Sequence, residues 1–205
     1  MVSTAAWIAL AAVIVQSAAE LANFGFDADL DALNADEEFN AFAWASSVST
    51  FAAAFFLFVP AVAAGTLDRV TVLLSGSLAF LSLDDAIGLH ERLAEHSVEI
   101  LDAEVSLQRV VWPLVYLPLL AFVFVILWRM ARCGSPTSIA LKAGLFLLAA
   151  AIVAELTSAL YVEEGVDTWP AAIEVAFEEG AELAGWILIA GGLGARAYLH
   201  AERRS

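Results

Sequence analysis

The sequence predicts an all-α integral membrane protein, a bundle of six transmembrane helices with both termini in the cytoplasm. Of its 205 residues, 61% are hydrophobic, and the mean hydropathy is +0.82. A water-soluble domain is normally closer to half apolar. Six stretches also reach the length of about 20 apolar residues that a helix needs to cross a bilayer. We therefore expect residues 1–205 to form one transmembrane domain of a multi-pass protein in the cell membrane.

The first apolar stretch covers residues 4–24 and has two interpretations. Residues 5–16 resemble the apolar part of a signal peptide, and the small residues Ser17-Ala18-Ala19 resemble a cleavage site. A signal peptide normally starts with basic residues, but no Lys or Arg precedes residue 69. We therefore expect a retained first helix, with cleavage of residues 1–19 as the alternative.

Short polar connections separate the other five predicted spans. The second and fourth spans contain Pro60, Pro113 and Pro118. Neighbouring helices can satisfy the carbonyls that proline leaves unbonded, so we interpret these residues as kinks rather than helix ends. Five glycines in the sixth span favour close helix packing. The five spans cover residues 41–66, 70–93, 110–131, 138–162 and 171–198.

The distribution of Lys and Arg predicts the orientation of the bundle. With a cytoplasmic N-terminus, only Arg92 and Arg109 face outward. All other basic residues face inward, as the positive-inside rule requires. They are Arg69, Arg129, Arg132, Lys142, Arg196, Arg203 and Arg204.

Charge and cysteine content exclude several classes of partner. The formal net charge is −15, and a nucleic-acid-binding protein needs clustered Lys and Arg instead. Cys133 is the only cysteine, so neither an intrachain disulfide nor a cysteine-based metal site can form. The lipid bilayer is the expected partner, and a homo-oligomer is compatible with the sequence. No substrate is indicated.

Six carboxylates in or beside the spans are the main functional signal. An ionisable group inside a membrane costs a few kcal/mol, so several of them indicate a site. At 1.5 Å per residue, Glu20, Asp84 and Glu155 lie about 21 to 25 Å from the inner ends of their helices. Glu178 lies about 10 Å from the outer end of its helix, so we expect one layer in the outer half. The six are Glu20, Asp84, Glu91, Glu155, Glu178 and Glu182.

Helical faces refine this layer. Glu178 and Glu182 are four residues apart and share a face. On one straight helix Asp84 and Glu91 also share a face, and His90 points about a third of a turn away from it. Gly88 could permit a distortion that turns His90 toward the acids.

Converging carboxylates in an apolar environment must share protons, contact water or bind a cation. Carboxylates with one imidazole suit Fe, Mn, Mg or Ca. The absence of a Glu-x-x-His pair separates the chain from ferritin-type di-metal bundles. We expect Glu20, Asp85 and Glu179 to surround the ligands of a divalent metal. The expected ligands are Asp84, His90, Glu91, Glu155, Glu178 and Glu182.

Two segments, FLSLDDAIGLHERL and FEEGAELAGW, carry a resemblance. They resemble a group of uncharacterised prokaryotic multi-pass membrane proteins. That group pairs a Leu-Asp-Glu…His-Glu segment with a later Glu-Glu-Gly-x-Glu segment, and this chain has Asp85 where Glu is expected. The resemblance implies a common site without implying an activity. Its members would be Asp84, Asp85, His90, Glu91, Glu178, Glu179 and Glu182.

Three classes of function fit these observations. The first is a membrane metalloenzyme that acts on a lipid-soluble or periplasmic substrate. The second is a cation or proton transporter whose carboxylates form the path. The third is a structural, non-catalytic membrane protein with a water-filled acidic vestibule. A path should continue into the inner half, where the second, fourth, fifth and sixth spans carry no acid or histidine, so a site is favoured.

The orientation can be tested with reporter fusions. We predict that residue 205 and Cys133 are cytoplasmic, and that the 25–40 and 94–109 loops lie outside the cell. A fusion that places residue 205 outside would contradict the orientation and the depth estimates that depend on it.

Overall fold

The computed structural model describes residues 1–26, 30, 40–101, 108–132, 134–158 and 168–203, and this part of the chain is helical apart from its turns and connections. Cys133 and most of the 25–40 loop lie outside it. The described residues form α1 (Val2–Phe26), α2 (Ala41–Ala63), α3 (Arg69–Ile87), α4 (Leu89–Leu101), α5 (Gln108–Met130), α6 (Pro136–Ser158) and α7 (Trp169–Glu202).

Five of these helices, α1, α2, α3, α5 and α6, are long and apolar enough to cross a membrane. The chain is therefore a multi-pass helical membrane protein. α7 has 34 residues but is not among the five. Its first half carries four glutamates, which lower its mean hydropathy. A helix of this length extends about 51 Å, more than the hydrocarbon thickness of about 30 Å. A sixth crossing by α7 stays a prediction.

Polar caps fix where the helices begin. The side chain of Asn40 accepts hydrogen bonds from the backbone N–H groups of Phe42 and Ala43 at the start of α2. Asp68 accepts from the N–H of Thr71 at 2.7 Å at the start of α3. The hydrogen bonds from Thr71 also hold the pKa of Asp68 below its ordinary value. These caps satisfy N–H groups that have no partner within the helix.

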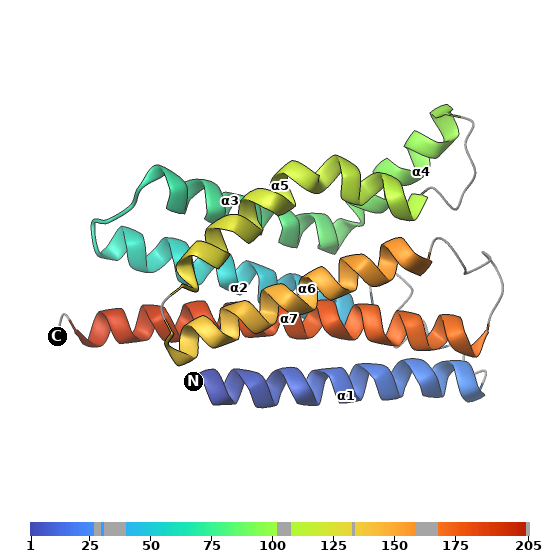
Figure 1. Cartoon of the computed structure of the whole chain (residues 1–205), viewed down its shortest axis with the longest axis horizontal. Coiled ribbons are helices and arrows are strands. Elements are labelled where there is room, and N and C mark those ends of the chain that lie inside the picture. Colours follow the sequence, from blue (N-terminus) through green and yellow to red (C-terminus); the bar gives the residue numbers. More distant parts are fainter. Residues whose placement is uncertain (27–29, 31–39, 102–107, 133, 159–167, 204–205) are drawn as a thin grey trace.

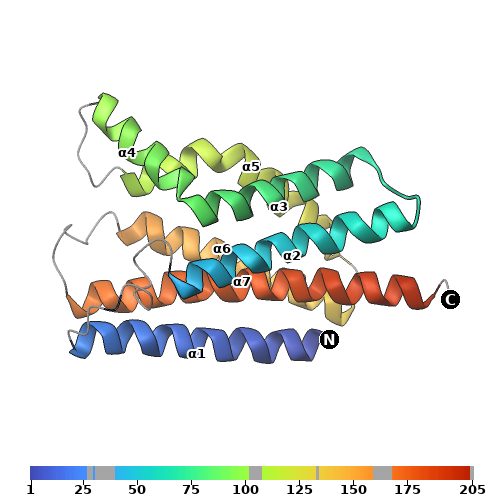
Figure 2. The same ribbon diagram turned by 180° about the vertical axis from the view of Figure 1, so that it is seen from behind.

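α7 is the central helix of the bundle. It packs against α1, α2 and α6, whereas α2 also pairs with α3. α5 lies against α3, α4 and α6. Figures 1 and 2 show α1 and α7 side by side along their length, with both termini toward the same end of the bundle. We call the opposite end, where α3 ends and α7 begins, the site end.

Much of the apolar core lies in the half of the bundle nearer the termini. Leu78 of α3, Leu127 of α5, Leu145 of α6 and Ile189 of α7 are almost completely buried there and belong to one cluster. The acidic residues of α3 and α7 come closer to the site end. The core therefore forms a floor below them.

The third predicted span, residues 70–93, is wrong as one continuous helix. Helix α3 ends at Ile87, and Gly88 has φ 57° and ψ 43°, in the left-handed region. Glycine reaches this conformation without the penalty that a Cβ imposes. The chain then restarts as α4, so residues 94–101, expected in a loop, are helical. The shared face of Asp84 and Glu91 was inferred for an unbroken helix, so that argument does not apply across the break at Gly88.

Glycines in α6 and α7 allow close approach, as the sequence predicted for the last span. A Cβ added to Gly144 of α6 would lie 2.7 Å from the Gly185 carbonyl oxygen and 2.7 Å from Ile189 Cγ1. Gly185 in turn faces Leu148, and Gly191 faces Ala5 of α1. Small residues at these crossings bring α6 and α1 close to α7.

We predict that Gly144→Ala lowers the melting temperature of the purified protein, because overpacking of this kind costs about 1 to 3 kcal/mol. Gly76→Ala in α3 is the matched control. Its new Cβ would meet nothing within 4 Å, and Ala favours a helix by up to about 1 kcal/mol over Gly. Thermal unfolding in detergent compares the two. Equal melting temperatures for both variants would contradict the close α6–α7 contact.

Candidate functional site

A cavity of about 690 Å³ lies toward the site end, lined by residues of all helices from α2 to α7. Among the described residues, its lining contains no Lys or Arg. It does contain His90 and a group of acids contributed by α3, α4, α6 and α7. We call these acids and His90 the acidic cluster: Asp84, Asp85, His90, Glu95, Glu155, Glu178, Glu179 and Glu182.

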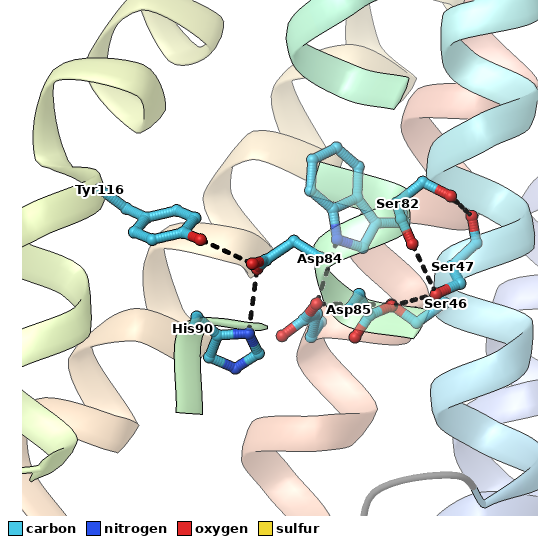
Figure 3. A network of polar contacts seen from close by, with 9 residues as sticks. Ser46, Ser47, Ser82, Asp84, Asp85, His90 and Tyr116 are labelled. Atoms are coloured by element: carbon cyan, nitrogen blue, oxygen red, sulfur yellow. Dashed lines mark hydrogen bonds and ion pairs between the residues drawn. The ribbon is translucent and has the colours of Figure 1, made fainter. Parts of the chain in front are cut away.

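Asp84 is held by partners from two other helices. It is 5% exposed and lies in the last turn of α3. The hydroxyl of Tyr116 on α5 donates to its Oδ1 at 2.6 Å. His90 Nδ1 lies 3.0 Å from its Oδ2 (Figure 3). The ring of Trp112 packs edge-on against His90 with centroids 5.0 Å apart. Asp84 and Trp112 therefore fix the orientation of the imidazole.

The break at Gly88 explains why His90 reaches Asp84. On a straight helix His90 would point away from the Asp84 face, as the sequence analysis assumed. The left-handed turn at Gly88 changes the direction of the chain between the two residues and places the imidazole beside the carboxylate. The sequence analysis noted that Gly88 could permit a distortion that turns His90 toward the acids. The structure has this distortion.

Two adjacent serines of α2 hold two more acids. Ser47 Oγ donates to Asp85 Oδ2 at 2.9 Å, and Ser82 Oγ donates to the Ser47 carbonyl at 2.7 Å (Figure 3). Ser46 Oγ lies 3.4 Å from Glu182 Oε1, which also accepts from Trp186 Nε1 at 3.2 Å. Neutral donors from α2 and α7 thus bond to one oxygen of Asp85 and one oxygen of Glu182.

Glutamates of α6 and α7 contact one another directly. Glu178 lies close enough to Glu155 of α6 and to Glu174 of its own helix for their carboxyl groups to interact. Glu182 lies close enough to His90 and Glu155 to interact with their charges. A hydrogen bond between two carboxyl groups needs a proton on one of them. Carboxyl groups this close in an apolar environment must therefore share a proton or bind a counter-charge.

The structure brings together most of the residues expected at the site. Asp84, His90, Glu155, Glu178 and Glu182 all line the cavity. Asp85 and Glu179, expected behind the ligands, also line it. Glu20 does not; it is buried on α1 and is 6% exposed. The side chain of Glu91 lies outside the described residues. As they stand, the described His, Cys, Asp and Glu side chains form no group of three or more placed to hold a metal ion.

Sequence reasoning missed Tyr116, Trp112, Ser46 and Ser47. One signal could have found Tyr116: it lies about 9 Å from the outer end of the predicted span 110–131, near the expected depth of Asp84. The serines stand in the polar run Ser46-Ser47-Val48-Ser49-Thr50 of an otherwise apolar span. The same depth argument that selected the acids applies to these donors.

Fold and cavity together define a multi-pass helical membrane protein with an acidic cavity inside its helix bundle. Residues 2–195 match a family described as a domain of unknown function, DUF8692, and the chain belongs to this family. A family of unknown function agrees with the resemblance to uncharacterised membrane proteins. No curated protein and no solved structure matches the chain.

We predict that Gly88→Ala lowers the melting temperature, because a Cβ in the left-handed region costs about 1 to 2 kcal/mol. Gly88→Asn is the matched control, since Asn tolerates this conformation better than other residues. The Asn variant should therefore melt between the wild type and the Ala variant. If both variants melt like the wild type, the chain does not need the left-handed turn that places His90.

Proposed function

We propose that the acidic cluster binds a divalent metal ion, Fe, Mn, Mg or Ca, in exchange for protons, within a cavity that faces the extracytoplasmic side. The observation that carries this proposal is that His90, Glu155, Glu178 and Glu182 converge from three helices in one cavity. No Lys or Arg among the described lining residues neutralises them.

The charge balance favours a cation. Carboxylates packed together in low dielectric cannot all be ionised without a counter-charge. The donors that reach them, Tyr116, Ser46, Ser47 and Trp186, are neutral and leave the total charge unchanged. A divalent cation removes two negative charges at once and prefers carboxylate oxygens as ligands.

The geometry assigns different roles to the residues. Glu155, Glu178 and Glu182 would bind the metal through their carboxylates. With Nδ1 facing Asp84, Nε2 of His90 is the ring nitrogen that can bind a metal. A carboxylate that accepts from the far nitrogen of a metal-binding histidine fixes its tautomer and raises its basicity. Asp84 would have this supporting role, with Tyr116 bound to its other oxygen.

Metal binding would require rearrangement of the glutamates. Glu178 lies within interaction distance of Glu155 and Glu174, and any proton shared in that contact must leave before a metal takes its place. The glutamates must also turn toward a common point, because the described side chains are not yet arranged as a ligand group. Metal affinity should therefore increase with pH.

Proton or cation transport is the second candidate, favoured by the same contacts among Glu155, Glu174 and Glu178. A chain of hydrogen-bonded carboxyls can pass protons. A path, however, has to continue through the membrane. Toward the termini, beyond the residues that line the cavity, lie Leu78, Leu127 and Ile189, almost completely buried and apolar. The floor of the cavity thus supports a binding site over a continuous path.

Glu178→Gln tests the metal proposal, since it keeps the shape of the side chain and removes its charge. We expect stoichiometric metal in the wild type and an affinity reduced about tenfold or more in the variant. Metal should raise the melting temperature of the wild type more than that of the variant. Glu202→Gln, on the same helix but outside the cavity, should behave like the wild type. Elemental analysis and thermal unfolding supply both readouts.

The competing interpretations give opposite results. In a merely crowded vestibule, Glu178→Gln relieves repulsion, so the variant would melt higher than a wild type that carries no stoichiometric metal. Infrared spectra of the wild type distinguish a metal-binding site from a site whose carboxyl groups only share protons. Protonated carboxyl absorption should fall when metal is added, and its persistence at neutral pH with metal present would contradict metal binding.

A further inference from the structure

The cavity has two ends of opposite chemistry. The acidic cluster forms one end, toward the site end of the bundle. The other end is formed by apolar side chains that α5 and α6 contribute beyond Tyr116 and Glu155. We call these residues the apolar arm: Leu120, Ala121, Phe124, Val125, Leu145, Leu148 and Ala149.

The apolar arm has considerable length. On α5, Val125 lies nine residues after Tyr116, about 13 Å along the helix axis. On α6, Leu145 lies ten residues before Glu155, about 15 Å along the axis. Both helices run from the acidic cluster toward the half of the bundle that holds the core. The arm therefore extends along the helix axes toward the middle of the predicted membrane. A volume of about 690 Å³ is within the usual range for small-molecule pockets.

The arm reaches the surface of the bundle between α5 and α6. Phe124 and Val125 line the cavity, yet they are 39% and 45% exposed. α6 packs much more extensively on α7 than on α5, and Figure 1 shows it lying along α7. In a membrane, the exposed faces of α5 and α6 contact lipid chains. A molecule dissolved in the bilayer can thus reach the arm from the side.

We propose that the cavity binds a long-chain amphiphile from the bilayer, with its hydrocarbon chain in the apolar arm and a hydroxyl or amine head at the acidic cluster. This proposal rests on the proposed function, because the metal and its carboxylates would hold the head. The substrate of that site would then be a lipid-soluble molecule.

Charge and polarity select this class of ligand. Even with one divalent metal bound, the acids of the cluster outnumber its two positive charges, so an anionic head would meet further acids with no Lys or Arg in the described lining to receive it. A plain hydrocarbon would leave carboxyl groups facing an apolar molecule, which is costly. A small water-soluble ligand would make no use of the arm. A neutral or cationic head on a hydrocarbon chain matches both ends.

Photoaffinity labelling of the full protein in lipid nanodiscs tests this proposal. Three probes of equal chain length carry a diazirine near the chain end and differ only in the head: amine, hydroxyl or carboxylate. We expect the amine and hydroxyl probes to label residues 120–125 and 145–149 several-fold more than the carboxylate probe. Mass spectrometry of the labelled peptides locates the sites.

Variants separate binding in the arm from contact with bulk lipid. Ala149→Trp should fill the arm and remove the head-dependent labelling. Phe146→Trp is the matched control on the same helix, because Phe146 is highly exposed and does not line the cavity. Leu120→Trp blocks the arm from α5 and gives a second variant if Ala149→Trp fails to fold. Equal labelling by all three probes, or unchanged labelling in a folded variant with a filled arm, would overturn the proposal.

Metal analysis of the same samples separates this proposal from the metal site. Ala149→Trp should lose labelling and keep stoichiometric metal, whereas Glu178→Gln should lose metal. Head-dependent labelling in a wild type without metal would refute the metal site and support amphiphile binding by the acids alone. Stoichiometric metal without head-dependent labelling would refute the amphiphile and leave the metal site standing.

Discussion

The presence of many carboxyl groups in an apolar bundle is the constraint on which the other features depend. Each of these groups would be costly without a hydrogen-bond partner. Neutral donors from three helices supply partners to Asp84, Asp85 and Glu182: Tyr116 on α5, Ser46 and Ser47 on α2, and Trp186 on α7. Because these donors carry no charge, they orient the acids without neutralising them. A carboxyl group held by a neutral donor can still release its proton and bind a cation, whereas an Arg or Lys in the same position would already form an ion pair with it.

Two backbone features make this arrangement of side chains possible. The left-handed turn at Gly88 lets one segment supply both Asp84, on α3, and His90, on α4. Glycines at Gly144 and Gly185 bring α6 and α7 close together, and this approach brings the carboxyl groups of Glu155 and Glu178 within interaction distance. The acidic cluster thus depends on glycine twice, once for a turn and once for a close helix crossing.

The apolar part of the bundle has a role in the proposed chemistry as well. The leucine-rich core closes the cavity toward the termini, which favours a site over a continuous path. The apolar arm opens the same cavity toward the bilayer, because Phe124 and Val125 belong both to its wall and to the outer surface. A divalent metal could polarise an oxygen of a bound hydroxyl head. Metal binding and amphiphile binding are therefore compatible in one cavity, and together they would suit a membrane metalloenzyme.

The sequence by itself determined the helical membrane class and the positions of most spans to within a few residues, because the length and hydropathy of an apolar stretch are local properties. It also selected Asp84, Glu155, Glu178 and Glu182 for one layer, because the rise per helical residue is constant. Only the tertiary structure decided that α3 ends at Gly88, that His90 faces Asp84, and that Tyr116, Ser46 and Ser47 supply the donors. Hydropathy does not encode the rotation of one helix about its axis relative to its neighbours. A glycine in a periodic pattern is compatible with both a straight helix and a left-handed turn, and packing against the other helices selects between them.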